Sequence, residues 1–116
     1  MKYREPIKFL EIIKMIKDNI DKGFSYCIYS KLSDSDDLEL DTICYIDDYS
    51  EIADDDEEIY SKFVIENELN FFFREELVQD VITNAFYQKP DVTDQEILEG
   101  IIYYNNKDNF MDFNHK

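Results

Sequence analysis

The stretch FSYCIYSKLSDSDDLELDTICYI, residues 24–46, predicts a pair of β-strands. Its two ends, residues 24–31 and 40–46, are rich in aromatic and β-branched residues, and neither has a clearly polar face. Residues 33–37 between them form a polar turn. A short polar link between two such runs favours an antiparallel hairpin. The short apolar run at residues 70–73 predicts a third strand.

Three other segments repeat apolar residues at helical spacing. The first starts at Pro6, which suits a first helical position because its missing N–H costs nothing there, and stops before Gly23. The second spans residues 74–88. The third follows a capping box, in which the Thr93 hydroxyl and the Glu96 carboxylate satisfy free N–H groups of the first turn.

A shorter helix is predicted within residues 57–69, after an acidic loop at residues 47–58. The apolar residues Phe110, Met111 and Phe113 either fold back onto the body or remain free. The order of elements predicts an α+β fold, with a small antiparallel sheet of about three strands and helices packed on one face. The length of 116 residues suits a single domain, residues 1–116.

The charge balance indicates which class of partner to expect. Twelve Lys and Arg residues stand against 28 Asp and Glu residues, which gives a net charge of −16. Such a charge repels nucleic acids and anionic membranes, because both are polyanions. We therefore expect a basic protein as partner, with no nucleic acid and no membrane, and the oligomeric state stays open.

Groups that could catalyse a reaction are scarce. The single histidine, His115, stands next to the C-terminal residue, and no phosphate-binding loop or zinc ligand set is present. Cys27 and Cys44 lie in apolar runs and are expected to be buried free thiols. We expect no enzyme activity, no cofactor and no metal, although weak binding of a divalent ion by residues 54–58 is an alternative. No signal peptide or membrane span is apparent, so the cytoplasm is the default location.

The distribution of charge is more informative than any motif. No basic residue lies between Lys31 and Lys62, whereas thirteen of the thirty intervening residues are acidic. Unpaired carboxylates in such numbers attract a basic partner over roughly 8 Å at physiological salt, and interleaved tyrosines are typical of contact surfaces. A solvated acidic face without a partner is the alternative interpretation. The residues predicted to bind the partner are Asp34, Asp36, Asp37, Asp47, Asp48, Tyr49, Glu51, Asp54, Asp55, Asp56, Glu57 and Glu58.

Several short motifs in the second half of the chain carry a resemblance. They are the run from Val78 to Ala85, Gln88-Lys89-Pro90, Tyr103-Tyr104 and Asp108-Asn109-Phe110, preceded by the predicted strand with Leu40-Asp41-Thr42. Together they resemble small acidic bacterial immunity proteins, which are associated with toxins of contact-dependent growth inhibition and polymorphic toxin systems. The resemblance implies a protein that binds its toxin in the cytoplasm and performs no reaction. It carries no functional residues over to this chain.

The charge and the resemblance favour the same function. The first hypothesis is an immunity protein that neutralises a cognate toxin, of a basic nuclease type, through an acidic surface. The second is an acidic mimic of nucleic acid that inhibits a restriction or CRISPR complex. A regulatory or structural module is a third, and an enzyme built on paired carboxylates is a fourth.

Overall fold

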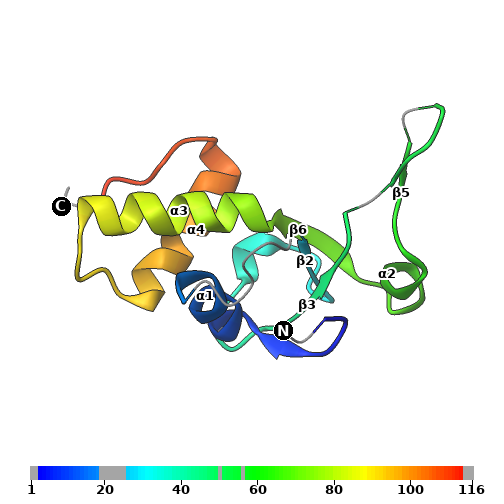
Figure 1. The fold of residues 1–116 in the computed structure, drawn as a ribbon, viewed down its shortest axis with the longest axis horizontal. Coiled ribbons are helices and arrows are strands. Elements are labelled where there is room, and N and C mark those ends of the chain that lie inside the picture. Colours follow the sequence, from blue (N-terminus) through cyan, green and yellow to red (C-terminus); the bar gives the residue numbers. More distant parts are fainter. Residues whose placement is uncertain (1–2, 19–25, 50, 56, 114–116) are drawn as a thin grey trace.

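A four-stranded antiparallel sheet forms the centre of the fold (Figure 1). The computed structural model of the protein describes residues 3–18, 26–49, 51–55 and 57–113. The strand order is β1-β3-β2-β6, and β2 and β3 form the predicted hairpin, in which Ile28 lies opposite Ile46. The strands of this sheet are β1 (Ile7–Lys8), β2 (Cys27–Ser30), β3 (Ile43–Asp47) and β6 (Asn70–Arg74).

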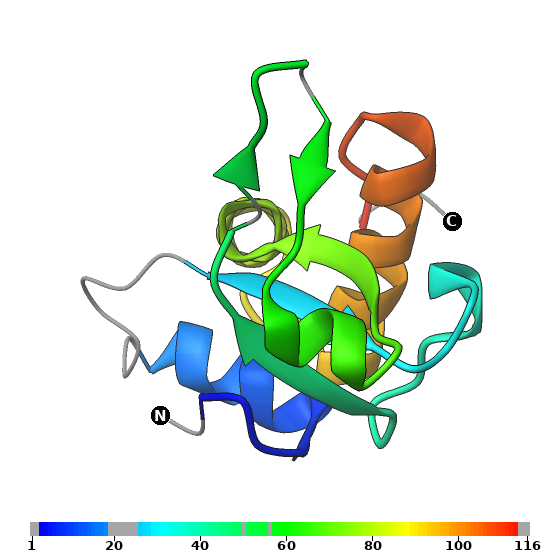
Figure 2. The same ribbon diagram turned by 90° about the vertical axis from the view of Figure 1, so that its right-hand side faces the viewer.

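Three helices cover one face of the sheet, and a short helix lies on the other face (Figures 1 and 2). The three are α1 (Phe9–Lys17), α3 (Glu75–Gln88) and α4 (Asp94–Lys107), and the short one is α2 (Lys62–Glu66). The prediction of an α+β fold is therefore confirmed. The main core between the three helices and the sheet includes Phe9, Ile12, Ile13, Tyr26, Ile28, Ile46, Phe73, Val78, Val81, Ile97 and Ile101.

The predicted capping box at the start of α4 is confirmed. The Thr93 hydroxyl accepts a hydrogen bond from the Glu96 N–H at 3.1 Å, and the Glu96 carboxylate accepts one from the Thr93 N–H at 3.0 Å. The Lys89 ammonium also donates to Glu96 at 2.7 Å, and together these contacts lower the pKa of Glu96 to about 2. The helix ends at Asp108, whose backbone is left-handed, with φ 54°.

The start of the chain differs from the prediction, because Pro6 does not begin a helix. A two-residue strand, β1, precedes α1 and pairs Ile7 with Cys44 at the edge of the sheet. The backbone N–H of Phe9, in the first turn of α1, donates to the Thr42 carbonyl at 2.9 Å. This tertiary contact satisfies one of the free N–H groups at the start of the helix. The acceptor, Thr42, is distant in the sequence, so no local pattern could predict it. Gly23 lies outside the described residues.

The acidic segment also differs from the prediction, because it is a two-stranded ribbon and not a loop. Its strands β4 (Glu51–Ile52) and β5 (Glu58–Ile59) are antiparallel and form a separate sheet. In Figures 1 and 2 this ribbon projects from the body of the molecule. The whole molecule, with the ribbon, measures 44 × 28 × 27 Å. The expected helix at residues 57–69 is reduced to the five residues of α2.

The C-terminal segment folds back onto the body. The Phe113 side chain is buried, and its backbone N–H donates to the Gln88 side chain at 3.0 Å. The Phe110 ring packs on Tyr104 with 4.9 Å between ring centres. Of the two alternatives for this segment, the structure therefore shows the packed one. Among the described residues, no helix has both the length and the apolar character needed to cross a bilayer.

Candidate functional site

The acids predicted to bind the partner separate into two groups on different parts of the molecule. One group comprises Asp34, Asp36 and Asp37, in and just before the 3-10 turn η1 (Ser35–Asp37). The other group lies on and beside the β4–β5 ribbon. Figures 1 and 2 show this turn and the ribbon apart in both views. The fold therefore presents no single surface that contains every predicted contact residue.

The η1 group lies against the C-terminal end of α4. The Asp34 carboxylate accepts a hydrogen bond from the Asp36 N–H at 2.9 Å, which caps the turn. The Asn106 side chain donates to the Asp36 carboxylate at 2.6 Å, and the Asn105 side chain donates to the Ser35 hydroxyl at 3.2 Å. These contacts anchor the turn to α4 without neutralising its charge.

Among the ribbon side chains that the structure describes, three acids are exposed, Asp54, Asp55 and Glu57, which we call the ribbon acids. The tip is closed by a hydrogen bond from the Ala53 N–H to the Glu57 carbonyl at 2.9 Å, and the Asp55 carboxylate accepts from the Glu57 N–H at 3.2 Å. Within the described ranges, no Lys or Arg forms an ion pair with any ribbon acid. The ribbon therefore holds uncompensated negative charge away from the body.

Three predicted contact residues on the ribbon cannot be placed in full. Asp56 lies outside the described residues, and so do the side chains of Glu51 and Glu58. The backbones of Glu51 and Glu58 belong to the paired strands β4 and β5.

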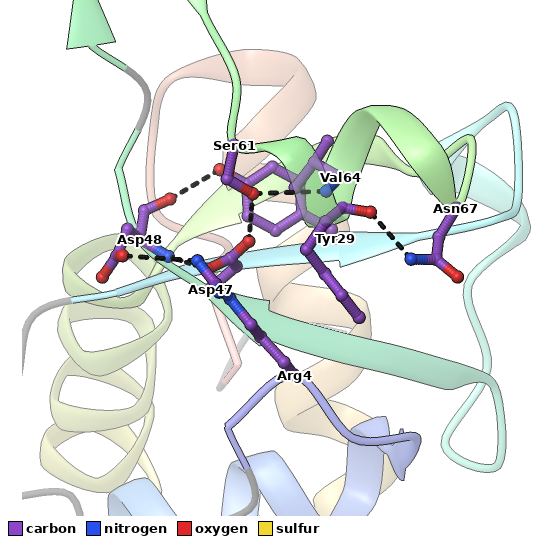
Figure 3. A network of polar contacts seen from close by, with 8 residues as sticks. Arg4, Tyr29, Asp47, Asp48, Ser61, Val64 and Asn67 are labelled. Atoms are coloured by element: carbon purple, nitrogen blue, oxygen red, sulfur yellow. Dashed lines mark hydrogen bonds and ion pairs between the residues drawn. The ribbon is translucent and has the colours of Figure 1, made fainter.

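Asp47 corrects the sequence prediction, because its side chain is buried, with 0% of its surface exposed. Its carboxylate accepts hydrogen bonds from Arg4 Nε at 2.8 Å, from the Asp48 N–H at 2.7 Å and from the Ser61 hydroxyl (Figure 3). The Ser61 oxygen in turn accepts from the Val64 N–H at 3.2 Å, which caps α2. Asp47 therefore cannot contact a partner, and it has a structural role instead.

This network closes the base of the ribbon. Asp47 is the last residue of β3, directly before the ribbon segment, and Ser61 directly follows that segment. Their hydrogen bond joins the two ends of residues 48–60, and Arg4 fixes the carboxylate from the N-terminal segment. The arrangement positions the whole acidic projection relative to the sheet.

The protonation state of Asp47 follows from its surroundings. Burial by itself raises the pKa of the carboxyl group, but the hydrogen bonds from Ser61, Arg4 and the Asp48 N–H outweigh it, so the pKa lies below the ordinary value. The hydrogen bond between Arg4 and Asp47 also raises the pKa of the Arg4 guanidinium. Both groups are therefore charged at neutral pH, as a buried carboxylate with a basic partner should be.

Tyrosines attach the first strand of the ribbon to the body. The Tyr29 hydroxyl donates to the Asp48 carbonyl at 2.8 Å, and the Tyr49 hydroxyl donates to the Glu76 carboxylate at 3.0 Å. Burial is the larger cause and the hydrogen bond with Glu76 the next, and together they raise the pKa of Tyr49 to about 12. The Arg74 guanidinium lies 5.6 Å from the centre of the Tyr49 ring. Tyr49, predicted as a contact residue, is thus half-buried and ties the ribbon to α3.

Sequence reasoning missed Arg4, Ser61 and Tyr29 as parts of this site. A serine two residues before the apolar pair Phe63-Val64 is a local signal for a helix N-cap, and it could have identified Ser61. Nothing local pointed to Arg4, because its partner Asp47 lies 43 residues away.

Cys27 and Cys44 are both buried and neither forms a disulfide, which confirms the prediction for these thiols. They belong to different apolar clusters, since Cys44 faces the main core and Cys27 lies in the smaller cluster under α2. Burial raises the pKa of Cys44 to about 12, so this thiol is unreactive. His115 lies outside the described residues. No group of three or more His, Cys, Asp or Glu side chains suited to a metal ion occurs in the part of the chain that the structure describes.

The unpaired acids lead to an expected response to salt. The melting temperature should rise between about 0.05 M and about 0.5 M NaCl, because screening weakens repulsion among the carboxylates. Calorimetry measures this shift. A variant with Asp54→Asn, Asp55→Asn and Glu57→Gln should show a smaller rise, because it has fewer like charges on the ribbon. A flat or falling response of the wild-type protein would contradict the expectation.

Comparison with known proteins identifies a family for this chain. Neither the search of curated proteins nor the search of solved structures returned a match. A family model described as a domain of unknown function, DUF7716, matches residues 7–113, which run from the first residue of β1 to Phe113. That description states no activity, so the resemblance to immunity proteins stays a prediction. The chain belongs to the DUF7716 family.

Proposed function

We propose that this domain binds a basic protein through the β4–β5 ribbon and so inhibits it. The observation that carries the proposal is the position of the ribbon acids, which project from the body and have no Lys or Arg ion-pair partner among the described residues. Exposed charge of one sign steers an oppositely charged surface into contact and raises the association rate. A basic partner would also relieve the repulsion among these carboxylates.

The shape of the ribbon suits an inhibitor. Two paired strands lie only about 4.8 Å apart, so the ribbon is a narrow element that can enter a groove. The buried Asp47 network holds its base, which limits the ordering cost of binding. A toxin nuclease presents a basic groove for its substrate, and an acidic projection is complementary to it. On this proposal the domain is a cytoplasmic immunity protein that blocks the substrate approach of a cognate toxin.

A mimic of nucleic acid has less support. Such a mimic needs carboxylates spaced like phosphates along one continuous ridge, whereas here the acids predicted to bind the partner lie partly in the η1 group and partly on the ribbon. The separation favours contact through one projecting element.

The test is titration with the purified C-terminal domain of a toxin encoded beside this protein. We expect the ribbon variant, with Asp54→Asn, Asp55→Asn and Glu57→Gln, to weaken binding at least tenfold, about 1.4 kcal/mol, mainly through slower association. The matched control removes three exposed charges elsewhere, with Glu39→Gln, Asp41→Asn and Asp91→Asn, and should change the affinity less than about threefold. Absence of binding at micromolar concentration would refute the immunity function. Equal losses in both variants would refute the role of the ribbon.

A further inference from the structure

A hollow lies where β6, α3 and α4 meet. It has a volume of about 350 Å³, and its lining includes Phe71 of the edge strand β6, Leu77 and Asp80 of α3, and Tyr104 of α4. Phe71 is 43% exposed, although it is a large apolar side chain. Among the described strands, β6 pairs with β2 alone, so this edge of the sheet ends at the hollow. The surface is concave and partly apolar, as peptide-binding surfaces commonly are.

A second hollow continues the first along α3. It has a volume of about 330 Å³ and is lined by Asp80, Thr83, Asn84, Tyr87 and Phe110. Asp80 lines both hollows, and the Tyr104 ring of the first contacts the Phe110 ring of the second. The two hollows therefore adjoin along α3, and we call them together the groove. From Glu76 to Tyr87 the helix rises about 16 Å.

Aromatic side chains stay exposed along this groove. Tyr87 is 88% exposed and Phe110 is 38% exposed, in addition to Phe71. Neighbouring exposed aromatic side chains on a concave surface are typical of contact sites, since they supply a large apolar area at a small cost in side-chain entropy. Isolated exposed apolar residues do not indicate a contact site, but these three aromatic residues line adjoining hollows.

The charge of the groove specifies what it can bind. Asp80 lies between the hollows, and in the described part of the chain it has no hydrogen bond or ion pair. The lining of the first hollow also includes Glu76, one turn earlier, which accepts from Tyr49, and Arg74, which lies over the Tyr49 ring. These three charged residues sum to −1, so the groove is negative overall, with Asp80 at its centre. It would pair with a Lys or Arg and would repel an acidic segment.

We propose that this groove binds an extended basic segment of another protein, with a Lys or Arg at Asp80 and a bulky apolar side chain in each hollow. In an extended segment, every second side chain points to the same face, and the first and fifth side chains lie about 13 Å apart. The pattern apolar-x-basic-x-apolar therefore fits within the length of about 16 Å along α3 and complements the charge of the groove. This proposal does not depend on the ribbon, since the groove and the ribbon acids have no residue in common.

The test is a titration of the isotope-labelled protein, followed by NMR, with the capped peptide Phe-Ser-Lys-Ser-Leu. The polar peptide Ser-Ser-Lys-Ser-Ser has the same charge and controls for simple attraction to an acidic protein. We expect the amphipathic peptide to bind at least about tenfold more tightly, because only it fills the hollows. Shifted amide signals should lie around Phe71, Asp80 and Phe110. Equal affinity of the two peptides, or shifts centred elsewhere, would overturn the proposal.

Matched variants separate the charge effect from the apolar effect. Asp80→Lys should weaken binding of the amphipathic peptide at least about tenfold, whereas Glu39→Lys makes the same charge change on an exposed residue elsewhere and should weaken it less than about threefold. Tyr87→Ser should also weaken binding, whereas Ile65→Ser, at a 63% exposed position on α2, should not. All four sites are exposed, so the amide spectrum of each free variant should show a retained fold. Equal effects within either pair would overturn the proposal.

Discussion

The variant Asp47→Ala should lower the free energy of unfolding by about 3 kcal/mol, because it removes a buried carboxylate that accepts three hydrogen bonds. Three donors lose their acceptor: the Arg4 guanidinium, the Asp48 N–H and the Ser61 hydroxyl. Chemical denaturation measures the loss. Amide exchange should also become faster in residues 48–60, because the hydrogen bond that joins the two ends of this segment is gone.

The neighbouring residue supplies the control. Asp48 also pairs with Arg4, at 3.7 Å, but its side chain is 68% exposed. Replacing it with Ala should cost less than about 1 kcal/mol, since exposed ion pairs contribute little. If the two variants lose equal stability, the buried network does not hold the base of the ribbon.

The effect of Asp47 should depend on pH, with a sign that follows from its lowered pKa. The folded-state pKa of this carboxyl lies below its unfolded value, so folding favours the charged form. Its stabilising contribution is therefore complete above the unfolded pKa of about 4 and is lost as the pH falls through the lower, folded-state pKa. The difference in stability between the wild-type protein and Asp47→Ala should shrink below about pH 4. A difference that grows with acidity would contradict this assignment.

The variant Phe113→Ala should cost a further large amount of stability, about 3 kcal/mol. The ring is buried in the main core, and its segment is attached by two hydrogen bonds of Gln88, one from the Phe113 N–H and one to the Met111 carbonyl, both at 3.0 Å. Thermal or chemical denaturation measures the loss. The exposed residue Phe110, replaced by Ala, is the control and should cost clearly less. Equal costs would mean that residue 113 is not part of the core in solution.

Gly100 provides a second test of the same contact. A Cβ atom at this position would lie 2.6 Å from Cζ of Phe113, well inside the normal separation of about 3.5 Å between carbon atoms. In the wild-type protein, Gly100→Ala should therefore be destabilising, because the Phe113 ring must move. In the Phe113→Ala background the same change should be stabilising by up to about 1 kcal/mol, because alanine is the better helix former. An effect of the same sign in both backgrounds would disprove the contact.

Much of the fold could be predicted from the sequence. Periodic apolar residues identified α3 and α4, and two aromatic and β-branched runs joined by a polar turn identified the hairpin of β2 and β3. The capping box at Thr93 marked the start of α4 within one residue. These features are local, because the apolar pattern of a helix or strand and the signals at its ends lie within a few neighbouring residues. Strand β1 and the ribbon were missed, since two-residue strands are too short to show any repeat.

The candidate site was predicted only in part. The exposure of Asp54, Asp55 and Glu57 followed from their chemistry, because carboxylates are rarely buried. Asp47 departs from that rule because Arg4 and Ser61 reach it from 43 and 14 residues away. The groove along α3 also joins residues from three separate elements. No local pattern contains such combinations.

The amino-acid sequence alone thus determined the fold class, the positions of the longer helices and the excess of negative charge. Tertiary structure alone decided which acid is buried and which acids project. The reason is physical: burial of a charge is tolerated only where distant partners replace its lost hydration, and folding decides whether those partners meet.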